Sequence, residues 1–532
     1  MNRNLPPLPD GEQNFANLRH DGSLYIDKTA LLQKLIEEGR WYFLSRPRRF
    51  GKSLTLSTLE AMFQGKKELF QGLAAEAWVE KQAKHPSPVL HLDLSAWPAA
   101  DPASTLPDWL INELQTFAVE HDISSKPVPS CAQTFSFLLK NACKSLGQVV
   151  VLIDEYDTPI LKNMHDPAQS HAIRSNLRDF YQILKSASAV IRFAFLTGIT
   201  KFSKTGVFSA LNNLRDISFA SFFSSITGYT QDEIYIYFAD YIQDVLNNKK
   251  STNKDDLLKK IKEYYDGYSF DGKTRVYNPF SILNFFYYKE FENYWYASGE
   301  PGYLAEYLKK YGIYNPDIYK NCVVDSLFTE TADIEKARPE SFLYQSGYLT
   351  ICKKELDTLT LDYPNREVIN SIAKMYLESI YTVPMYKSLT MRLQEAFSAK
   401  NFSSVVTIFN SELAGLPYAD FQNAGEGIYR TAFLLLIRAS NLIVKIENPS
   451  KKGRTDIVIE GKDTVFIIEF KVAKTKKDIL KKCSEGFAQF REKEYLSQYA
   501  NEARDVQAYV LVIDAETHTA TAFDVKTKAE LS

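Results

Sequence analysis

Apolar and polar positions divide the chain into three stretches with different periodicities. Up to residue 199, short apolar runs are separated by segments in which apolar residues recur every three or four positions. The runs predict strands at 23–27, 41–45, 89–95, 148–157 and 190–199. The longer spacing predicts amphipathic helices at 28–39, 52–63 and 105–121. Strands that alternate with helices in this way predict a parallel sheet covered by helices on both faces.

The rest of the chain changes period twice. From Thr230 to about residue 400 the pattern is helical and rich in aromatic residues, which predicts a helical lid and connector. Beyond residue 401 a helix is followed by strands at 441–447, 455–460 and 464–471, a helix at 476–495 and a strand at 506–515. We therefore expect an α/β protein with three parts, at residues 1–229, 230–400 and 401–532.

Composition narrows the class of protein. A chain of 532 residues exceeds the size at which one hydrophobic core stops growing, so several domains are expected. The five cysteines are scattered and form no CxxC pair, which fits a reducing compartment. The first residues lack an apolar signal core, and no run of about 18 apolar residues could cross a bilayer. We expect a cytoplasmic protein with no membrane partner.

The local distribution of charge is more informative about nucleic-acid binding than the net charge. The net charge of -2 gives no support to nucleic-acid binding. Residues 445–493, however, hold 13 Lys or Arg against 8 Asp or Glu, including a lysine run between 474 and 482. That run could follow a phosphate backbone, or it could be a solvated helix face.

The sequence between the strand at 41–45 and the helix at 52–63 has the features of a phosphate-binding loop. It reads SRPRRFGKS, and backbone N–H groups at such a helix N-terminus cradle phosphate. The lysine of this motif reaches the β and γ phosphates, and the hydroxyl after it binds Mg²⁺. The full motif has glycine where Arg46 stands, so a structural turn is the alternative. The candidate nucleotide-binding residues here are Arg49, Phe50, Gly51, Lys52, Ser53 and Leu54.

A second motif strengthens the nucleotide interpretation. Four consecutive apolar residues lead directly into Asp154 and Glu155. Such a strand delivers the aspartate to Mg²⁺ and the glutamate to the attacking water, although acidic strand ends also occur without this chemistry. Thr197 ends another strand, where it could sense the γ phosphate or simply terminate the strand. No trans-acting arginine is identifiable, because surface or core roles fit Arg192 and Arg215 better.

A third constellation lies near the C-terminus. Asp456 lies on one expected strand and Glu469 and Lys471 on the next, and period-two alternation places the last two on one face. A turn near Gly461 folds that face back beside Asp456. Two carboxylates and an ammonium can hold Mg²⁺, activate water and stabilise charge during phosphodiester hydrolysis. A structural ion pair between Glu469 and Lys471 is the alternative.

Flanking residues could complete this third site. Glu426, on the preceding helix, could be a further metal ligand beside Asp456 and Glu469, and Gln489 on the following helix could position the scissile phosphate or the lysine. Substrate contact or simple packing would explain three other residues, Tyr429, Lys493 and Tyr495.

The ordered motifs closely resemble a known family. They are SLYIDKT, FLSRPRRFGKSL, VVVLIDEYDTP, FLTGITKFS, YYDGYSF, VYNPFSI, NYWYASG, GRTDIVI and IIEFK. The chain is similar over nearly its whole length to bacterial AAA-ATPase-like proteins with a C-terminal PD-(D/E)xK nuclease domain. The resemblance implies that arginine at position 46 is a family trait and that the last part has a restriction-endonuclease-like fold. It does not imply a substrate, and defence against phage or mobile elements follows by analogy alone.

Together these features predict an enzyme that uses ATP and Mg²⁺. We expect an ATPase that gates cleavage of nucleic acid, with DNA favoured over RNA. One alternative is an ATP-dependent switch whose nuclease-like part only binds nucleic acid, and the intact set Asp456, Glu469 and Lys471 argues against it. Another is a signalling scaffold that binds nucleotide without turnover, which leaves Glu155 without a role. A homo-oligomer and an unidentified activating partner stay open.

Overall fold

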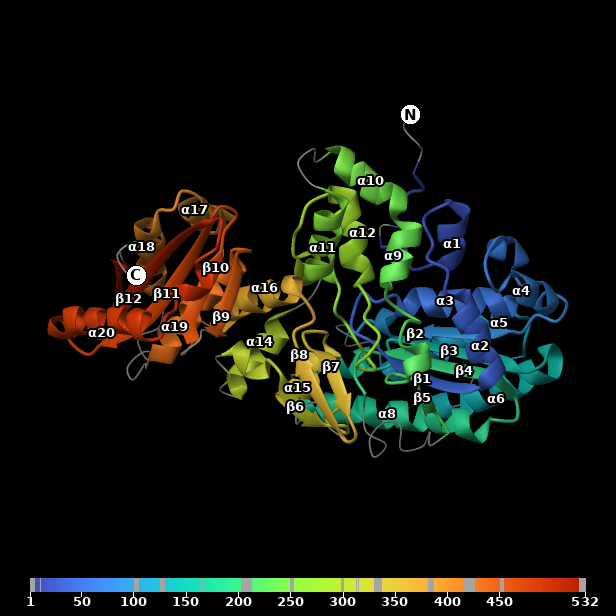
Figure 1. The fold of residues 1–532 in the computed structure, drawn as a ribbon. Helices are drawn as coiled ribbons and strands as arrows, with labels where there is room; N and C mark the ends of the chain where they lie inside the picture. The colour runs from blue at the N-terminus through green and yellow to red at the C-terminus, as the bar shows by residue number, and fades with distance from the viewer. Residues whose placement is uncertain are drawn as a thin grey trace. The chain divides into compact units, whose positions relative to one another are not determined.

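The computed structural model describes most of the chain (Figure 1). The described ranges are residues 5–9, 11–99, 105–124, 130–163, 166–201, 213–248, 253–297, 301–311, 313, 315–329, 337–380, 387–414, 426–449 and 454–525. Contacts group the chain into two compact units. The first unit contains residues 1–297 and 319–366, and the second contains residues 298–318 and 367–532. Residues 230–400 therefore contribute to both units, and the three-part division by sequence stays a prediction.

A five-stranded parallel sheet forms the centre of the first unit. Its order is β2-β3-β4-β1-β5, and every neighbouring pair is parallel. The strands are β1 Trp41–Ser45, β2 Val89–Asp93, β3 Val149–Asp154, β4 Ile191–Gly198 and β5 Arg215–Asp216. Because the strands are parallel, the carboxyl ends of β1, β3 and β4 meet at one edge of the sheet, where Ser45, Asp154 and Gly198 lie.

Helices cover both faces of this sheet, as the alternating pattern predicts. One core joins α1 Phe15–His20, α2 Thr29–Glu38, α3 Lys52–Gln64 and α4 Glu76–Gln82 to side chains of β1–β4. The other face is covered by α6 Cys131–Leu146, which packs on α5 Leu106–Glu120 and α8 Pro167–Ser186. α3 and α8 lie on opposite sides of the sheet (Figure 1).

The strand predicted at 23–27 is wrong. The structure forms no strand at these residues. Leu24 and Ile26 pack into a helical core, whereas Tyr25 packs into the core over the main sheet. The alternation is real, but it serves two cores on either side of an isolated segment.

The middle of the chain is helical in part. α9 Gln231–Tyr237, α10 Ala239–Asn248, α11 Lys254–Tyr265 and α12 Pro279–Tyr288 share an aromatic core, which α13 Tyr294–Ala297 follows. The structure also contains an antiparallel sheet that the sequence did not predict, in the order β6-β8-β7. Its first strand precedes α15 Pro339–Gln345 in the chain, and its other two strands follow that helix. Its strands are β6 Cys322–Asp325, β7 Thr350–Glu355 and β8 Thr358–Asp362.

The second unit is a mixed five-stranded sheet between helices. Its order is β13-β12-β11-β10-β9, with β11 and β12 parallel and the other pairs antiparallel. The strands are β9 Ile443–Pro449, β10 Arg454–Glu460, β11 Thr464–Ala473, β12 Asp505–Asp514 and β13 Thr519–Val525. The sequence predicted the first four of these and missed β13.

Two sets of helices enclose this second sheet. α20 Ile479–Glu492 covers one face through Cys483 and Phe490, which share a core with Val465 and Ile467 of β11. On the other face, aromatic contacts join β11 and β12 to α17 Lys387–Ser398, α18 Phe402–Leu413 and α19 Glu426–Ala439. α14 Pro301–Lys310 and α16 Arg366–Met375 complete the unit, with a π-helix at Tyr376–Ile380.

Among the described residues, no helix combines the length and the apolar character that crossing a lipid bilayer requires.

Candidate functional site

The phosphate-loop motif lies where β1 passes into α3. Gly51 is the N-cap of α3 and has φ of 86°, in the left-handed region that favours glycine. The backbone N–H of Thr55 donates to the carbonyl of Gly51 at 3.0 Å, so the helix starts directly after Gly51. The loop and the positive end of the α3 dipole form an arrangement that suits an anion.

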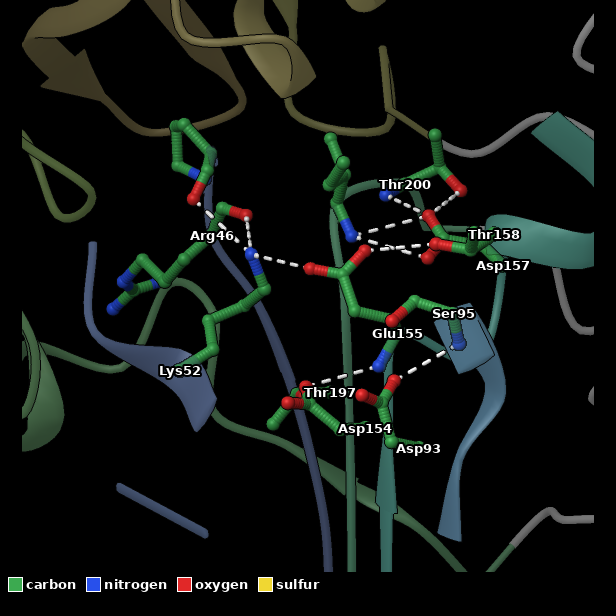
Figure 2. A network of polar contacts seen from close by, with 12 residues as sticks. Arg46, Lys52, Asp93, Ser95, Asp154, Glu155, Asp157, Thr158, Thr197 and Thr200 are labelled. Atoms are coloured by element: carbon green, nitrogen blue, oxygen red, sulfur yellow. Dashed lines mark hydrogen bonds and ion pairs between the residues drawn. The ribbon is translucent and has the colours of Figure 1, made fainter. Parts of the chain in front are cut away.

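Lys52 is buried beside the loop. Its Nζ donates to the carbonyl oxygens of Arg46 and Pro47, each at 3.2 Å. The same atom lies 3.5 Å from Oε1 of Glu155 (Figure 2). The structure thus brings together the lysine of the first motif and the glutamate of the second.

Asp154 and Thr197 also meet at this edge of the sheet. The Thr197 hydroxyl and the backbone N–H of Glu155 both donate to Oδ1 of Asp154 (Figure 2). Burial raises the pKa of Asp154, while hydrogen bonds from Ser53 and Thr197 and the charge of Lys52 oppose that rise. Thr197 therefore orients the predicted Mg²⁺ ligand, and its predicted contact with the γ phosphate stays a prediction.

Glu155 is held in an unusual conformation. Its φ is 50°, a left-handed value that costs energy for a residue with a side chain. Burial favours the neutral carboxyl, but Lys52, a hydrogen bond from Thr158 at 2.8 Å and the charge of Arg48 outweigh it and hold the pKa below its ordinary value. The carboxylate is therefore ionised at neutral pH, as activation of water requires.

Asp157 was not identified from the sequence. It is fully buried and accepts hydrogen bonds from the backbone N–H groups of Ile199 and Thr200, at 3.1 and 2.6 Å, and from the Thr200 hydroxyl. Burial raises its pKa to about 6. The available signal was a second aspartate three residues after Asp154, still beside the end of a buried strand. Asp157 holds the turn after β4 against the turn after β3.

Packing, not glycine, shapes the loop at Arg46. This arginine is 1% exposed, and its Nη1 donates to the carbonyls of Ser45 and Ser218 at 2.9 and 2.8 Å. Its guanidinium carbon lies 3.7 Å from the centre of the Phe270 ring. Burial lowers its pKa to about 10, which leaves the side chain charged at neutral pH. Nε and Nη2 have no hydrogen-bond partner among the described residues.

The next loop residues are braced by the same part of the chain. Phe50 packs edge-on against Tyr268 and Phe270, with ring centres 4.8 and 5.7 Å apart. A Cβ on Gly347 would approach the Pro47 ring to 2.7 Å, so glycine permits this contact. The Phe50 side chain thus serves packing, as does that of Leu54, which lies on the main core. Only their backbone groups are left as candidates for phosphate contact.

The remaining arginine candidates have different surroundings. Arg49 is exposed over the ring of Phe280, 4.9 Å from its centre, and can reach solvent or ligand. Arg192 donates to Ser87 and Gln82 at 2.6 and 2.8 Å, which gives it a structural role. Burial raises the pKa of the Tyr42 hydroxyl, and the charge of Arg215 opposes that rise.

The third constellation assembles on β10 and β11. Antiparallel pairing places Ile457 opposite Ile468, so Asp456 comes beside Glu469. Oδ2 of Asp456 accepts the backbone N–H of Phe470 at 2.9 Å. Lys471 Nζ donates to Oε1 of Glu469 at 2.8 Å. The structure therefore brings the two carboxylates and the lysine together on the face covered by α20.

Glu469 is the most perturbed of these groups. It is 3% exposed, and burial raises its pKa to about 7, with a further rise from Asp456 that Lys471 opposes. Its Oε2 has no hydrogen-bond partner among the described residues, and the same holds for Oε1 of Gln489. A buried carboxylate oxygen without a donor matches the demand of a cation for an oxygen ligand.

Three other candidate residues of this site are Glu426, which lies near the two carboxylates, and Lys493 and Tyr495, which follow α20. The pKa of Glu426 is raised by burial, then lowered by Lys471 and raised again by Asp456, which places Glu426 near both. Across the described ranges, however, no three His, Cys, Asp or Glu side chains converge closely enough to hold a metal ion. Lys493 is half-buried just after α20. Tyr495 is 2% exposed and belongs to the core between sheet and helix.

Arg430 was missed by the sequence analysis. Its Nη1 lies 2.9 Å from Oδ1 of Asp456, so it faces the predicted metal ligand from α19. The signal was its position four residues after Glu426, which places both on one side of a helix. Tyr429, on the same helix, is fully buried and its hydroxyl bonds His518.

Comparisons with known proteins agree with this division of chemistry. Residues 9–208 match the family described as "Predicted AAA-ATPase", and residues 424–523 match the "PD-(D/E)XK nuclease superfamily". A protein of Azotobacter chroococcum mcd 1, named "Uncharacterized protein in vnfD 5'region", is 32% identical over 540 residues, covering 98% of each chain. The predicted resemblance and fold class are confirmed. The chain belongs to the family of AAA-ATPase-like proteins that carry a C-terminal PD-(D/E)XK nuclease domain.

Proposed function

We propose that this protein binds and hydrolyses ATP and uses that reaction to gate Mg²⁺-dependent cleavage of phosphodiester bonds in nucleic acid, DNA in preference to RNA. The observation that carries the proposal is the buried Glu469 carboxylate beside Asp456 and Lys471, one oxygen of which has no partner among the described residues. The Lys52–Glu155 pair supports the ATPase half, because both residues lie in the family match to ATPases.

The ATPase step uses residues at the edge of the first sheet. In this structure the Lys52 ammonium contacts two loop carbonyls and the Glu155 carboxylate. When the β and γ phosphates enter the loop, they attract this ammonium, and the ionised Glu155 becomes available to orient and polarise the attacking water. Ser53 and Asp154 would hold Mg²⁺, which supplies positive charge to the phosphates. Thr197 keeps the Asp154 carboxylate in place.

The cleavage step uses the second sheet. Asp456 and Glu469 would hold a divalent cation, which supplies charge to the scissile phosphate and acidifies a water molecule. Hard carboxylate oxygens suit Mg²⁺ or Mn²⁺, and the raised pKa of Glu469 indicates that a cation would stabilise its ionised form. Lys471 can then turn from Glu469 towards the attacking water and the phosphate oxygens.

The biological setting of this activity is also a proposal. We infer that the protein acts in the cytoplasm, in defence against phage or mobile elements, by analogy with gated nucleases. AAA-like ATPases often complete their sites across subunits, so a homo-oligomer is expected. An activating partner would explain an ATPase whose nuclease is silent in isolation.

Cleavage assays with matched variants test the proposal. Labelled single- and double-stranded DNA and RNA are incubated with the protein in Mg²⁺ or Mn²⁺, with and without ATP. Glu469→Ala should lose cleavage and keep ATPase activity, whereas Glu460→Ala, a paired glutamate on β10, should keep both. Lys52→Ala should lose nucleotide binding and the ATP dependence of cleavage, with Lys34→Ala on α2 as its control.

Each outcome has a definite meaning. Loss of cleavage in Glu469→Ala alone supports the nuclease assignment and identifies its substrate. Unchanged cleavage in that variant contradicts it. ATPase activity with no cleavage of any substrate would favour the nucleic-acid-binding or signalling switch over the nuclease.

A further inference from the structure

A run of lysines follows directly after the strand that carries Lys471. β11 ends at Ala473, a 3-10 turn covers residues 476–478, and α20 begins at Ile479. Along this path lie five lysines, which we call the basic edge: Lys474, Lys476, Lys477, Lys481 and Lys482.

Among the described residues, acidic side chains balance only part of the charge of the basic edge. The acidic residue inside it, Asp478, accepts a hydrogen bond from the Thr475 hydroxyl at 2.9 Å, which fixes the turn. Lys482 pairs with Glu485 at 2.6 Å. The other four lysines form no ion pair with any described residue, and like charges held together on one surface favour an anionic partner.

The basic edge lies beside the proposed cleavage site. Lys481 and Lys482 lie on α20, which packs through Cys483 on Val465 and Ile467 of β11, the strand that carries Glu469 and Lys471. α20 is packed tightly against the sheet, so the position of its lysines relative to β11 is fixed. Its Gly486 is so close that a Cβ would lie 2.5 Å from the side chain of Val510.

One apolar residue interrupts the lysines. Leu480 lies in the first turn of α20 and is 72% exposed. An exposed leucine between Lys477 and Lys481 cannot pair with phosphate, but it can pack on a sugar or the face of a base.

We propose, resting on the proposed function, that the basic edge binds the phosphate backbone of DNA entering the nuclease site and that Leu480 contacts its sugars or bases. The lysines of the basic edge follow β11, which carries Lys471, directly along the chain. A DNA strand whose scissile phosphate lies at Lys471 would therefore pass over the basic edge next. Charge complementarity therefore selects a polyanion, and proximity to the cleavage centre selects the substrate itself.

Salt-dependent binding separates the two kinds of contact. Binding of a fluorescent DNA duplex to the full chain is measured in EDTA, without ATP, from about 50 to 200 mM salt. The slope of log K against log salt is negative, and each lost phosphate contact reduces its magnitude by about 0.9. Lys476→Gln/Lys477→Gln should reduce this magnitude by about 2, whereas Lys309→Gln/Lys310→Gln, on the exposed end of α14, should leave it unchanged. Leu480→Ala should weaken binding several-fold at every salt concentration without a change of slope.

The outcomes distinguish this inference from the proposed function. An unchanged slope in the Lys476/Lys477 variant, an equal change in the α14 control, or no DNA binding by the unmodified protein overturns the inference. Because the assay contains neither metal nor ATP, a chain that binds with the expected slopes but never cleaves would contradict the nuclease and leave the basic edge standing. Equal melting temperatures of the four proteins exclude unfolding as the cause.

Discussion

Replacing Glu469 by glutamine should make the metal-free protein more stable while it abolishes cleavage. The carboxyl of Glu469 is 3% exposed, and its pKa rises from 4.5 to about 7, because burial and Asp456 disfavour its charge. A group with a raised pKa in the folded state stabilises the fold fully below 4.5, and that contribution is lost as the pH rises through 7. Glutamine stays neutral and avoids the loss.

The size of the effect follows from the same pKa. One unit corresponds to about 1.4 kcal/mol, so at pH 8 the ionised carboxylate costs up to about 3 kcal/mol. This pKa already contains the opposing effect of Lys471. Incomplete hydrogen bonding of the buried glutamine amide reduces the gain to roughly 1–3 kcal/mol. For a domain of about 200 residues this raises the melting temperature by roughly 3–10 °C. The gain should vanish towards pH 5, where the native carboxyl is protonated.

Two spectroscopic signals assign this change to the correct unit. All five tryptophans lie in the first unit, at positions 41, 78, 97, 109 and 295. Thermal unfolding in EDTA should therefore shift by circular dichroism and stay unchanged by tryptophan fluorescence. Adding Mg²⁺ should stabilise the unmodified protein and not the variant. Glu485→Gln, an exposed change on α20, is the control and should show no gain at pH 8. A less stable Glu469→Gln protein at pH 8, or an equal gain at pH 5, would refute the reasoning.

Three further predictions concern the first unit. Glu155→Gln should bind ATP normally and release phosphate at least roughly 100-fold more slowly, since it removes the ionised base; normal turnover would refute that role. Phe270→Ala removes the ring over Arg46 and should weaken ATP affinity in equilibrium titration, because large-to-small core changes cost about 3–5 kcal/mol and free the loop; an unchanged affinity would show that the brace is irrelevant to binding. Gly267→Ala places a Cβ 2.0 Å from the Pro364 carbonyl at φ of 101° and should destabilise the first unit by roughly 2 kcal/mol or more. Tryptophan fluorescence on heating measures this loss, which an unchanged melting curve would contradict.

The sequence could predict which residues come together at the two candidate sites because each site depends on a strand. Val150, Leu152 and their neighbours form a fully buried apolar run, which has few structural alternatives to a central strand. Parallel pairing then brings the ends of β1, β3 and β4 together without further information. The hairpin at Gly461 likewise determines which residues face Glu469.

The bracing of the phosphate loop could not be predicted in this way. Arg46 contacts Phe270 and hydrogen-bonds Ser218, partners more than 170 positions away along the chain. Local periodicity carries no information about such a pairing, so arginine in the place of glycine looked like a defect in a motif. β13 escaped notice because its alternation of threonine and alanine is weakly apolar. The segment at 23–27 misled for the opposite reason, since its apolar residues serve two cores.

The division of the chain has a consequence for its synthesis and dissection. The second unit takes residues 298–318 from the middle of the sequence, where Leu304, Tyr307 and Leu308 are buried and Asp317 pairs with Arg438 at 2.8 Å. During translation these residues leave the ribosome before the residues after 367 have been synthesised. The apolar side of α14 therefore stays exposed until the rest of the second unit is made. For the same reason, no single cut isolates an intact second unit. A chain truncated to start at residue 367 lacks α14 and leaves Arg438 without its aspartate, so the nuclease half is best studied within the whole protein.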